Sequence, residues 1–206
     1  MITFDDPFLK PGEKLVCFGD SLTHEGVYVN ELQKLLPQNT IVNAGRGGDK
    51  TPWALTRFQT DVIDAKPDAL LIFLGTNDAA IGRGCWADEP MVPPQVYCTN
   101  LVWMTHLAKL KGLRKISIAT PLGSFEGPAY LMHGDILRDY CQAARDAASL
   151  SGSRLIPLDA WFWETRPARP LTEKLMTRDG THPLEDSYRK IAGYMVKSWN
   201  MASAKA

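Results

Sequence analysis

The amino-acid sequence predicts an α/β protein built on a parallel β-sheet. Short apolar runs rich in β-branched residues alternate with longer segments of helical period, which is typical of repeated βα units. The run ALLIFL at residues 69–74 has six apolar residues without alternation, which indicates a strand buried on both faces. Five strands are expected, at residues 14–18, 40–43, 69–74, 115–119 and 154–158.

Five helices are expected between and after these strands. Proline and glycine mark several of their ends: the first stops at Pro37, the second begins beside Pro52, and Gly112 suits the C-cap of the third. The expected helices cover residues 27–36, 52–65, 95–111, 128–150 and 183–200. Residues 82–94, which contain three prolines, are expected to form a long loop after the third strand.

The chain is long enough for one sizeable core. A protein of 206 residues buries roughly 70% of the surface of its unfolded chain. The sequence contains no internal repeat, low-complexity tract or linker, so we expect residues 1–206 to form a single domain.

Composition excludes several classes of protein. Lys and Arg total 23, as do Asp and Glu, so the chain has no net charge to attract nucleic acid or an anionic membrane. No stretch approaches the length of a membrane span, and the N-terminus lacks the features of a signal peptide. The four cysteines form no CxxC pair, which argues against a zinc site and a disulfide framework. We therefore expect a cytoplasmic location and no nucleic-acid partner, while the oligomeric state stays open.

Four short motifs fall where a parallel sheet places its ligands. In such sheets, ligands bind outside the carboxyl ends of the strands. Three motifs follow predicted strands and the fourth precedes the last helix. They are GDSL at residues 19–22, NAGRGGD at 43–49, GTND at 75–78 and DGTHP at 179–183. Each motif alone is weak evidence, but together they indicate one site.

Three of these residues suit acyl transfer, which needs a nucleophile, a base and an anion that orients the base. Ser21 can serve as the nucleophile at a strand-to-helix turn. His182 precedes Pro183, so its imidazole should project from a loop, and Asp179 is close enough in sequence to reach the ring. The alternatives are that Ser21 only caps a helix and that Asp179 belongs to an ordinary turn.

Two further residues could stabilise a developing oxyanion. Asn77 could present its amide to a substrate oxygen, and Gly48 could present a backbone N–H. Their alternatives are a structural turn and a flexible loop. Phosphate-binding and dinucleotide-binding motifs are excluded, because Asp49 and Lys50 occupy positions that need glycine. Thr23 likewise replaces the last glycine of an α/β-hydrolase elbow.

The extended motifs resemble those of the GDSL/SGNH hydrolase family of esterases and lipases. The matching segments are FGDSLT at residues 18–23, NAGRGGDKT at 43–51, LGTND at 74–78 and DGTHP at 179–183. Together they span nearly the whole chain. The resemblance implies a three-layer α/β/α sandwich around a five-stranded parallel sheet, the flavodoxin-like arrangement.

The resemblance also implies residue roles. Ser21 would be the nucleophile, His182 the base and Asp179 the acid that orients the base. The backbone N–H groups of Ser21 and Gly48, with the side-chain amide of Asn77, would form the oxyanion hole. The reaction implied is ester hydrolysis through an acyl-serine, without metal or organic cofactor.

Neighbouring residues of the motifs receive other interpretations. Gly45 is a second candidate for the oxyanion hole, but Gly48 is preferred because it directly precedes Asp49, as in the family pattern. Asp20, Asp49 and Asp78 could suggest a carboxylate metal site. We interpret them instead as residues that hold the strand-end loops by hydrogen bonds.

Substrate preference rests on weaker signals. The expected substrates are small-molecule or carbohydrate esters with short acyl groups, above all acetyl groups on a carbohydrate. Tryptophans near strand ends could stack on a sugar ring, or else fill the core, and loop arginines could meet a carboxylate or remain solvated. These candidates are Trp53, Trp86, Trp161, Trp163, Arg46 and Arg83. The alternative functions are an acyltransferase using the same triad, a catalytically silent carbohydrate-binding protein, and a flavodoxin-like binding protein.

Overall fold

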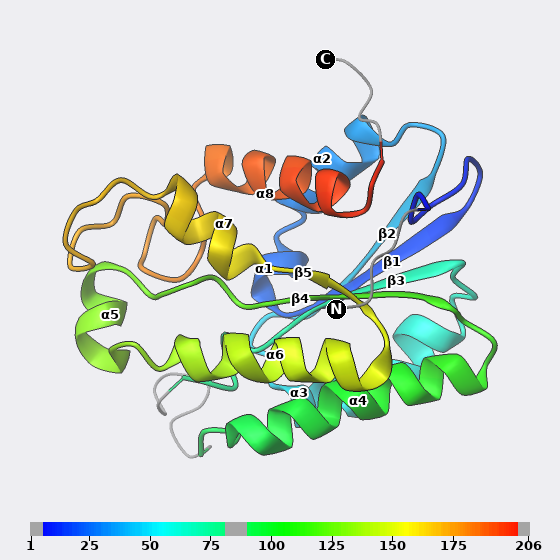
Figure 1. Ribbon diagram of the computed structural model, residues 1–206, viewed down its shortest axis with the longest axis horizontal. Coiled ribbons are helices and arrows are strands. Elements are labelled where there is room, and N and C mark those ends of the chain that lie inside the picture. The colour runs from blue at the N-terminus through cyan, green and yellow to red at the C-terminus, as the bar shows by residue number, and fades with distance from the viewer. Residues whose placement is uncertain (1–5, 81–89, 202–206) are drawn as a thin grey trace.

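In the computed structural model, which describes residues 6–80 and 90–201, five parallel strands form one sheet in the order β2-β1-β3-β4-β5 (Figure 1). The strands are β1 (Lys14–Gly19), β2 (Thr40–Gly45), β3 (Ala69–Phe73), β4 (Lys115–Ala119) and β5 (Arg154–Ile156). This order has its switch point between β1 and β3, which is where open parallel sheets bind ligands. The motifs that contain Ser21 and Asn77 follow these two strands.

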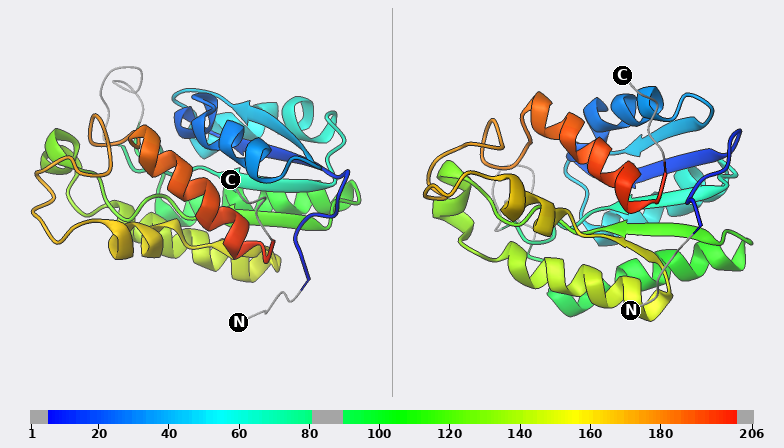
Figure 2. Two further views of the ribbon diagram at one scale, coloured as in Figure 1. Left: turned by 90° about the horizontal axis from the view of Figure 1, so that it is seen from above. Right: turned by 45° about the horizontal axis from the view of Figure 1, so that its top comes forward.

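Helices cover both faces of the sheet (Figure 2). One face carries α3 (Thr51–Phe58), its π-helical continuation η1 (Gln59–Ile63), α4 (Pro94–Leu110) and α6 (Leu137–Ser151). The other carries α2 (Val27–Leu35), α7 (Leu158–Thr165) and α8 (Glu185–Ser198). The result is the predicted three-layer α/β/α sandwich, so the fold class is confirmed.

Strand β3 shows why its sequence lacks alternation. Ala69, Leu71 and Phe73 pack into the hydrophobic cluster under α2 and α8. Leu70 and Ile72 pack into the cluster under α4 and α6. All five side chains are buried because helices cover both faces of the sheet, so every position favours an apolar residue.

Most predicted boundaries differ from the structure by one or two residues, and within two predicted elements another helix begins. The helix expected at residues 128–150 is split into α5 (Gly127–His133) and α6, because Gly134 adopts φ 62° and ψ −147° and ends α5. The strand expected at 154–158 ends at Ile156. Pro157, which has no N–H to donate to a strand ladder, comes next, and the unpredicted α7 starts at Leu158.

Three further differences concern helices. The helix expected at residues 52–65 ends as the π-helical turn η1. Helix α8 starts at Glu185 rather than Pro183, because Pro183 forms an isolated β-bridge with Thr177. A short unpredicted helix, α1 (Ser21–His24), follows β1. No helix within the described ranges is both long and apolar enough to cross a membrane. The single domain stays a prediction.

Candidate active site

Ser21 follows the carboxyl end of strand β1, which lies between β2 and β3 in the sheet. The strand ends at Gly19, and Asp20 caps α1 by accepting a hydrogen bond from the N–H of Leu22 at 2.9 Å. A Cβ at Gly19 would lie 2.1 Å from the hydroxyl oxygen of Thr23, so only glycine allows the chain to turn this tightly. This turn makes Ser21 the first residue of α1.

His182 and Asp179 approach Ser21 from the last loop, 161 residues away in sequence. The Nε2 atom of His182 lies 2.9 Å from Oγ of Ser21, and its Nδ1 atom lies 2.7 Å from Oδ2 of Asp179. Gly180 has φ 99°, and a Cβ there would lie 2.2 Å from the carbonyl oxygen of Glu126. The structure therefore brings the three predicted residues into one hydrogen-bonded series.

The carboxylate of Asp179 is held in its ionised form. Burial favours the neutral acid, but hydrogen bonds from the backbone N–H groups of His182 and Thr181 and from the imidazole outweigh it. The net effect is a pKa of Asp179 below its ordinary value. A negative charge therefore faces Nδ1 of His182, which favours a proton on that nitrogen.

Asn77 and Gly48 belong to two loops joined to each other. The side-chain amide of Asn77 is buried and donates a hydrogen bond to the carbonyl oxygen of Asp49 at 3.0 Å. Gly48, directly before Asp49, has φ 80°, a conformation that favours glycine. The N–H of Arg46 donates to the carbonyl oxygen of Gly19 at 3.0 Å, which connects this loop to the turn before Ser21.

Arg57 organises these loops and was not among the residues predicted from the sequence. Its buried guanidinium donates to the Asp49 carboxylate at 2.5 Å and to the carbonyl oxygens of Gly19 and Ala44 at 2.8 Å each. One side chain thus joins the ends of β1 and β2 to the glycine-rich loop. Arg57 also forms an ion pair with Asp61, four residues later in the sequence. This spacing on a helix was the available sequence signal.

Glu25 is a second carboxylate beside the imidazole, and it was not predicted from the sequence. Its Oε1 atom lies 3.8 Å from Nε2 of His182. Burial favours its neutral form, but hydrogen bonds from Arg178 and Tyr188 outweigh this effect and lower the pKa of Glu25. No sequence signal marked Glu25, because its partners come from distant segments.

The aspartates of the strand-end motifs act as hydrogen-bond acceptors. Asp78 accepts from the N–H of Thr51 at 3.0 Å and from its hydroxyl at 2.5 Å, and Asp20 caps α1. Burial raises the pKa of Asp78 to about 6 and that of Asp20 to about 7. Among the residues that the structure describes, no three His, Cys, Asp or Glu side chains are grouped so as to hold a metal ion.

A buried ion pair supports the loop that contains the candidate base. Arg166 donates to Oε1 of Glu126 at 2.6 Å, and the side chains of both residues are at most 3% exposed. The backbone N–H of Glu126 donates to the carbonyl oxygen of Gly180 at 2.9 Å. The pair was not predicted, because forty residues separate the two partners in the sequence.

The substrate-binding candidates are scattered. Trp161 is buried in the core, whereas Trp163 is exposed. Trp53 is half-buried on α3 and Arg46 is exposed in its loop. Within residues 6–80 and 90–201, no hydrogen bond or ion pair joins either side chain to the triad. Trp86 and Arg83 lie outside the described residues, as does most of the loop expected at 82–94.

Comparisons with known proteins found a matching family model and several similar proteins. A family model described as the GDSL-like lipase/acylhydrolase family matches residues 17–190. Over 116 residues, the chain is 39% identical to the uncharacterized lipoprotein YqeF of Bacillus subtilis (strain 168), a match to 50% of this chain and 46% of that protein. The chain thus spans less than half of that relative's length.

A second relative and a solved structure match more of the chain. An arylesterase of Vibrio mimicus is 27% identical over 197 residues, which cover 90% of this chain and 87% of that protein. The crystal structure of Axe2, an acetylxylan esterase of Geobacillus stearothermophilus, matches with a TM-score of 0.76 at 23% identity. The match covers 94% of this chain and 97% of the other, and at this identity it shows a shared fold.

Proposed function

The chain belongs to the GDSL-like lipase/acylhydrolase family and is a serine ester hydrolase, and we propose that it cleaves short-chain esters, preferably acetyl esters of carbohydrates, through an acyl intermediate on Ser21. The observation that carries the proposal is the series of contacts from Asp179 through His182 to Ser21, at 2.7 and 2.9 Å. Family membership argues against the catalytically silent and flavodoxin-like alternatives.

In the proposed first half-reaction, Oγ of Ser21 attacks the carbonyl carbon of the ester. Nε2 of His182 takes the hydroxyl proton as the bond forms, and the carboxylate of Asp179 stabilises the resulting imidazolium through Nδ1–H. The tetrahedral intermediate then collapses. The alcohol leaves with the proton from Nε2, and the acyl group stays on Ser21.

Three N–H donors would stabilise the oxyanion in each half-reaction. They are the backbone N–H groups of Ser21 and Gly48 and one N–H of the Asn77 amide. An amide nitrogen carries two hydrogens, and the bond to the Asp49 carbonyl oxygen uses one of them. Because that bond fixes the amide, its second hydrogen can be held in place before the substrate binds, which supports a preorganised oxyanion hole.

In the second half-reaction, water takes the place of the alcohol. His182 removes a proton from water, the resulting hydroxide attacks the acyl carbon, and Ser21 leaves after taking the proton back from Nε2. The products are the carboxylic acid and the free enzyme. His182 carries the proton in every step and the oxyanion donors stabilise the developing negative charge, so the steps proposed here use no metal and no organic cofactor.

A fluorophosphonate probe tests the nucleophile. We expect the wild-type protein to be labelled on Ser21 and the Ser21→Ala variant to stay unlabelled. The control is Ser149→Ala, which removes an exposed serine of α6 and should be labelled like the wild type. Thermal melts of the variants would show whether folding is retained. Equal labelling of Ser21→Ala, or labelling of a different residue in the wild type, would reject the assignment.

The preference for acetyl esters of carbohydrates is supported by one similar protein, the acetylxylan esterase Axe2. The arylesterase of Vibrio mimicus supports ester hydrolysis but not a sugar substrate. Hydrolysis rates on p-nitrophenyl acetate, butyrate and octanoate, together with acetate release from acetylated xylan, test it. We expect kcat/KM to fall with acyl length and acetate to be released from the xylan. Faster cleavage of the octanoate, or no release from xylan, would contradict the preference.

A cytoplasmic location stays a prediction for this chain. It rests on cysteine usage, since no CxxC pair or disulfide framework is expected. Fractionation of cells that make the protein, with immunoblotting of the fractions, would test it. Recovery in the membrane fraction would contradict it.

A further inference from the structure

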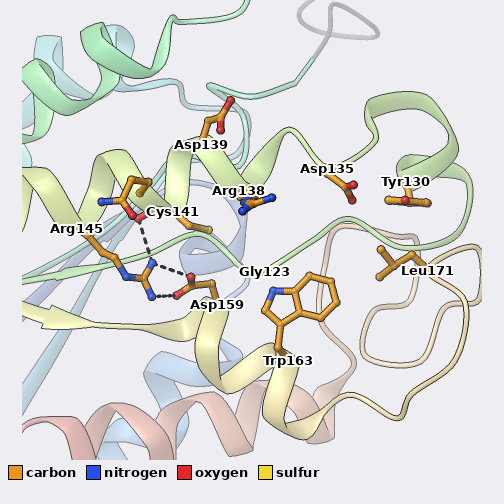
Figure 3. A pocket seen from close by; sticks show the side chains of 11 residues that line it. Gly123, Tyr130, Asp135, Arg138, Asp139, Cys141, Arg145, Asp159, Trp163 and Leu171 are labelled. Atoms are coloured by element: carbon orange, nitrogen blue, oxygen red, sulfur yellow. Dashed lines mark hydrogen bonds and ion pairs between the residues drawn. The ribbon is translucent and has the colours of Figure 1, made fainter.

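A cavity of about 840 Å³ opens between α5, α6 and α7, outside the triad (Figure 3). Its wall includes Gly123 from the loop after β4, Arg138 from α6 and Trp163 from α7, and Ser21, Asp179 and His182 are not part of it. The mechanism above makes no use of this cavity, although its volume lies in the range of ligand sites.

Trp163 gives the cavity a fixed aromatic surface. A Cβ at Gly123 would lie 2.4 Å from Nε1 of the indole, so the absence of a side chain there lets the ring edge rest on the backbone. Buried Phe162 packs against the indole edge-on, with ring centroids 5.2 Å apart. Trp163 nevertheless stays 51% exposed. Its open surface suits the C–H face of a sugar ring, since an aromatic face carries partial negative charge.

The polar side chains of the cavity include both donors and acceptors. Arg145 makes a bidentate ion pair with Asp159, at 2.7 and 2.8 Å, and the hydroxyl of Thr120 also donates to that carboxylate. Arg138 and Asp139 are exposed, and neither makes a side-chain hydrogen bond or ion pair with another described residue. These two side chains are therefore available to a ligand.

The charges of the cavity almost cancel. The cavity is lined by three carboxylates, those of Asp135, Asp139 and Asp159, and by two guanidiniums, those of Arg138 and Arg145. Asp159 is paired with Arg145, whereas the side chain of Asp139 points away from Trp163 (Figure 3). A phosphate or polyanion would meet an excess of like charge, and a cation would meet Arg138. A neutral ligand with many hydroxyl groups fits best, because each hydroxyl can both donate and accept a hydrogen bond.

The cavity adjoins the loop that contains the candidate base. Gly123 is three residues before Glu126, and three residues span at most about 11 Å. The N–H of Glu126 donates to the carbonyl oxygen of Gly180, two residues before His182. One loop thus forms a wall of the cavity and contacts the segment that positions the imidazole.

We propose that this cavity is a binding subsite for the neutral oligosaccharide part of the substrate, with one sugar ring stacked on Trp163 and its hydroxyl groups bonded to Arg138. This proposal rests on the function proposed above. The subsite holds a sugar at a distance from the ester, so a chain of several sugar units would occupy both places.

Titration with xylotetraose, which has no acetyl group and cannot be hydrolysed by an esterase, tests the subsite. The chain has six tryptophans, whose indole N–H signals can be followed by two-dimensional NMR in ¹⁵N-labelled protein. Trp103, on α4 and outside the cavity wall, is also 51% exposed and serves as the matched control. We expect the Trp163 signal to shift on titration and the Trp103 signal to stay in place.

Variants extend the test. Trp163→Ala should weaken xylotetraose binding about tenfold or more. Arg138→Ala, at an exposed position where folding is not at risk, should weaken it severalfold, and Trp103→Ala should bind like the wild type.

An unchanged Trp163 signal at about 10 mM sugar, or equal binding by Trp163→Ala, would overturn the subsite. Stronger binding of an anionic galacturonate oligomer would overturn the neutral class. Fluorophosphonate labelling of the same samples reports on Ser21 separately, so failure of the subsite is distinguishable from failure of the esterase.

Discussion

Oε2 of Glu126 lies 2.9 Å from the backbone nitrogen of Thr177, which donates a hydrogen bond to it across 51 residues of sequence. The same oxygen also accepts from the hydroxyl of Thr177 at 2.7 Å and from the N–H groups of Leu175 and Met176. Thr177 in turn forms the β-bridge with Pro183, next to His182. Glu126 therefore fixes the position of the loop that presents the imidazole.

Glu126→Gln should destabilise the protein and slow catalysis. The change leaves the buried guanidinium of Arg166 without its carboxylate, and loss of one partner of a buried ion pair costs about 3–5 kcal/mol. Urea unfolding measures this cost, and kcat on p-nitrophenyl acetate should fall at temperatures where the variant is folded. The control is Glu173→Gln, which breaks a solvent-exposed pair with Arg169 and should cost less than about 1 kcal/mol. A loss below 1 kcal/mol for Glu126→Gln would contradict the buried role.

Asp179→Asn should lower kcat by about 10⁴, because an amide nitrogen in place of Oδ2 donates a hydrogen bond where Nδ1 of His182 needs an acceptor. The imidazole would then carry its proton on Nε2 and could not take the proton of Ser21. Steady-state kinetics on p-nitrophenyl acetate measure the effect. A loss of less than tenfold would show that the orientation of the ring does not depend on this carboxylate.

Asn77→Ala should reduce kcat by roughly 10²–10³, the usual effect of removing one oxyanion donor. KM should change little, because the donor acts mainly on the charge that develops in the transition state. The substitution also removes the bond to Asp49, so a thermal melt must accompany the kinetics. A rise in KM at constant kcat would place Asn77 in substrate binding instead.

Asp20→Asn should change the dependence of stability on pH. Burial raises the pKa of Asp20 from 3.8 to about 7, so between these values the folded protein binds a proton that the unfolded chain releases. The wild type should therefore lose stability as pH rises from 4 to 7. The variant lacks this titration, so its stability relative to the wild type should rise over that window by on the order of 2–4 kcal/mol.

Urea unfolding at several pH values between 4 and 8 measures this difference. The asparagine can keep the bond from the N–H of Leu22 that caps α1, which limits other effects of the change. Asp186→Asn, at a position 69% exposed on α8, is the control and should show no such trend. Parallel pH profiles for Asp20→Asn and the wild type would contradict the prediction.

Local sequence patterns were sufficient for the parallel sheet and the set of candidate catalytic residues, and the family resemblance added the three-layer sandwich. Strand β3 was recognisable because burial on both faces requires apolar residues at every position. The motifs around Ser21 and His182 were recognisable because a sheet collects the residues that follow its strands at one edge. Each strand and each motif depends on neighbours in the chain, which the sequence displays directly. The contact between Ser21 and His182, 161 residues apart, needs the folded chain.

The long-range contacts that support the site became visible only in the folded chain. Arg57 gathers two strand ends, Glu126 holds the loop before His182, and Glu25 lies beside the imidazole, each through partners far away in sequence. The cavity at Trp163 likewise needs Gly123, from a separate loop, to make room for the indole. A charged side chain such as Arg57 or Glu126 stabilises the fold only when folding buries it beside an opposite charge or a hydrogen-bonding group. Which groups come together depends on which loops meet in space.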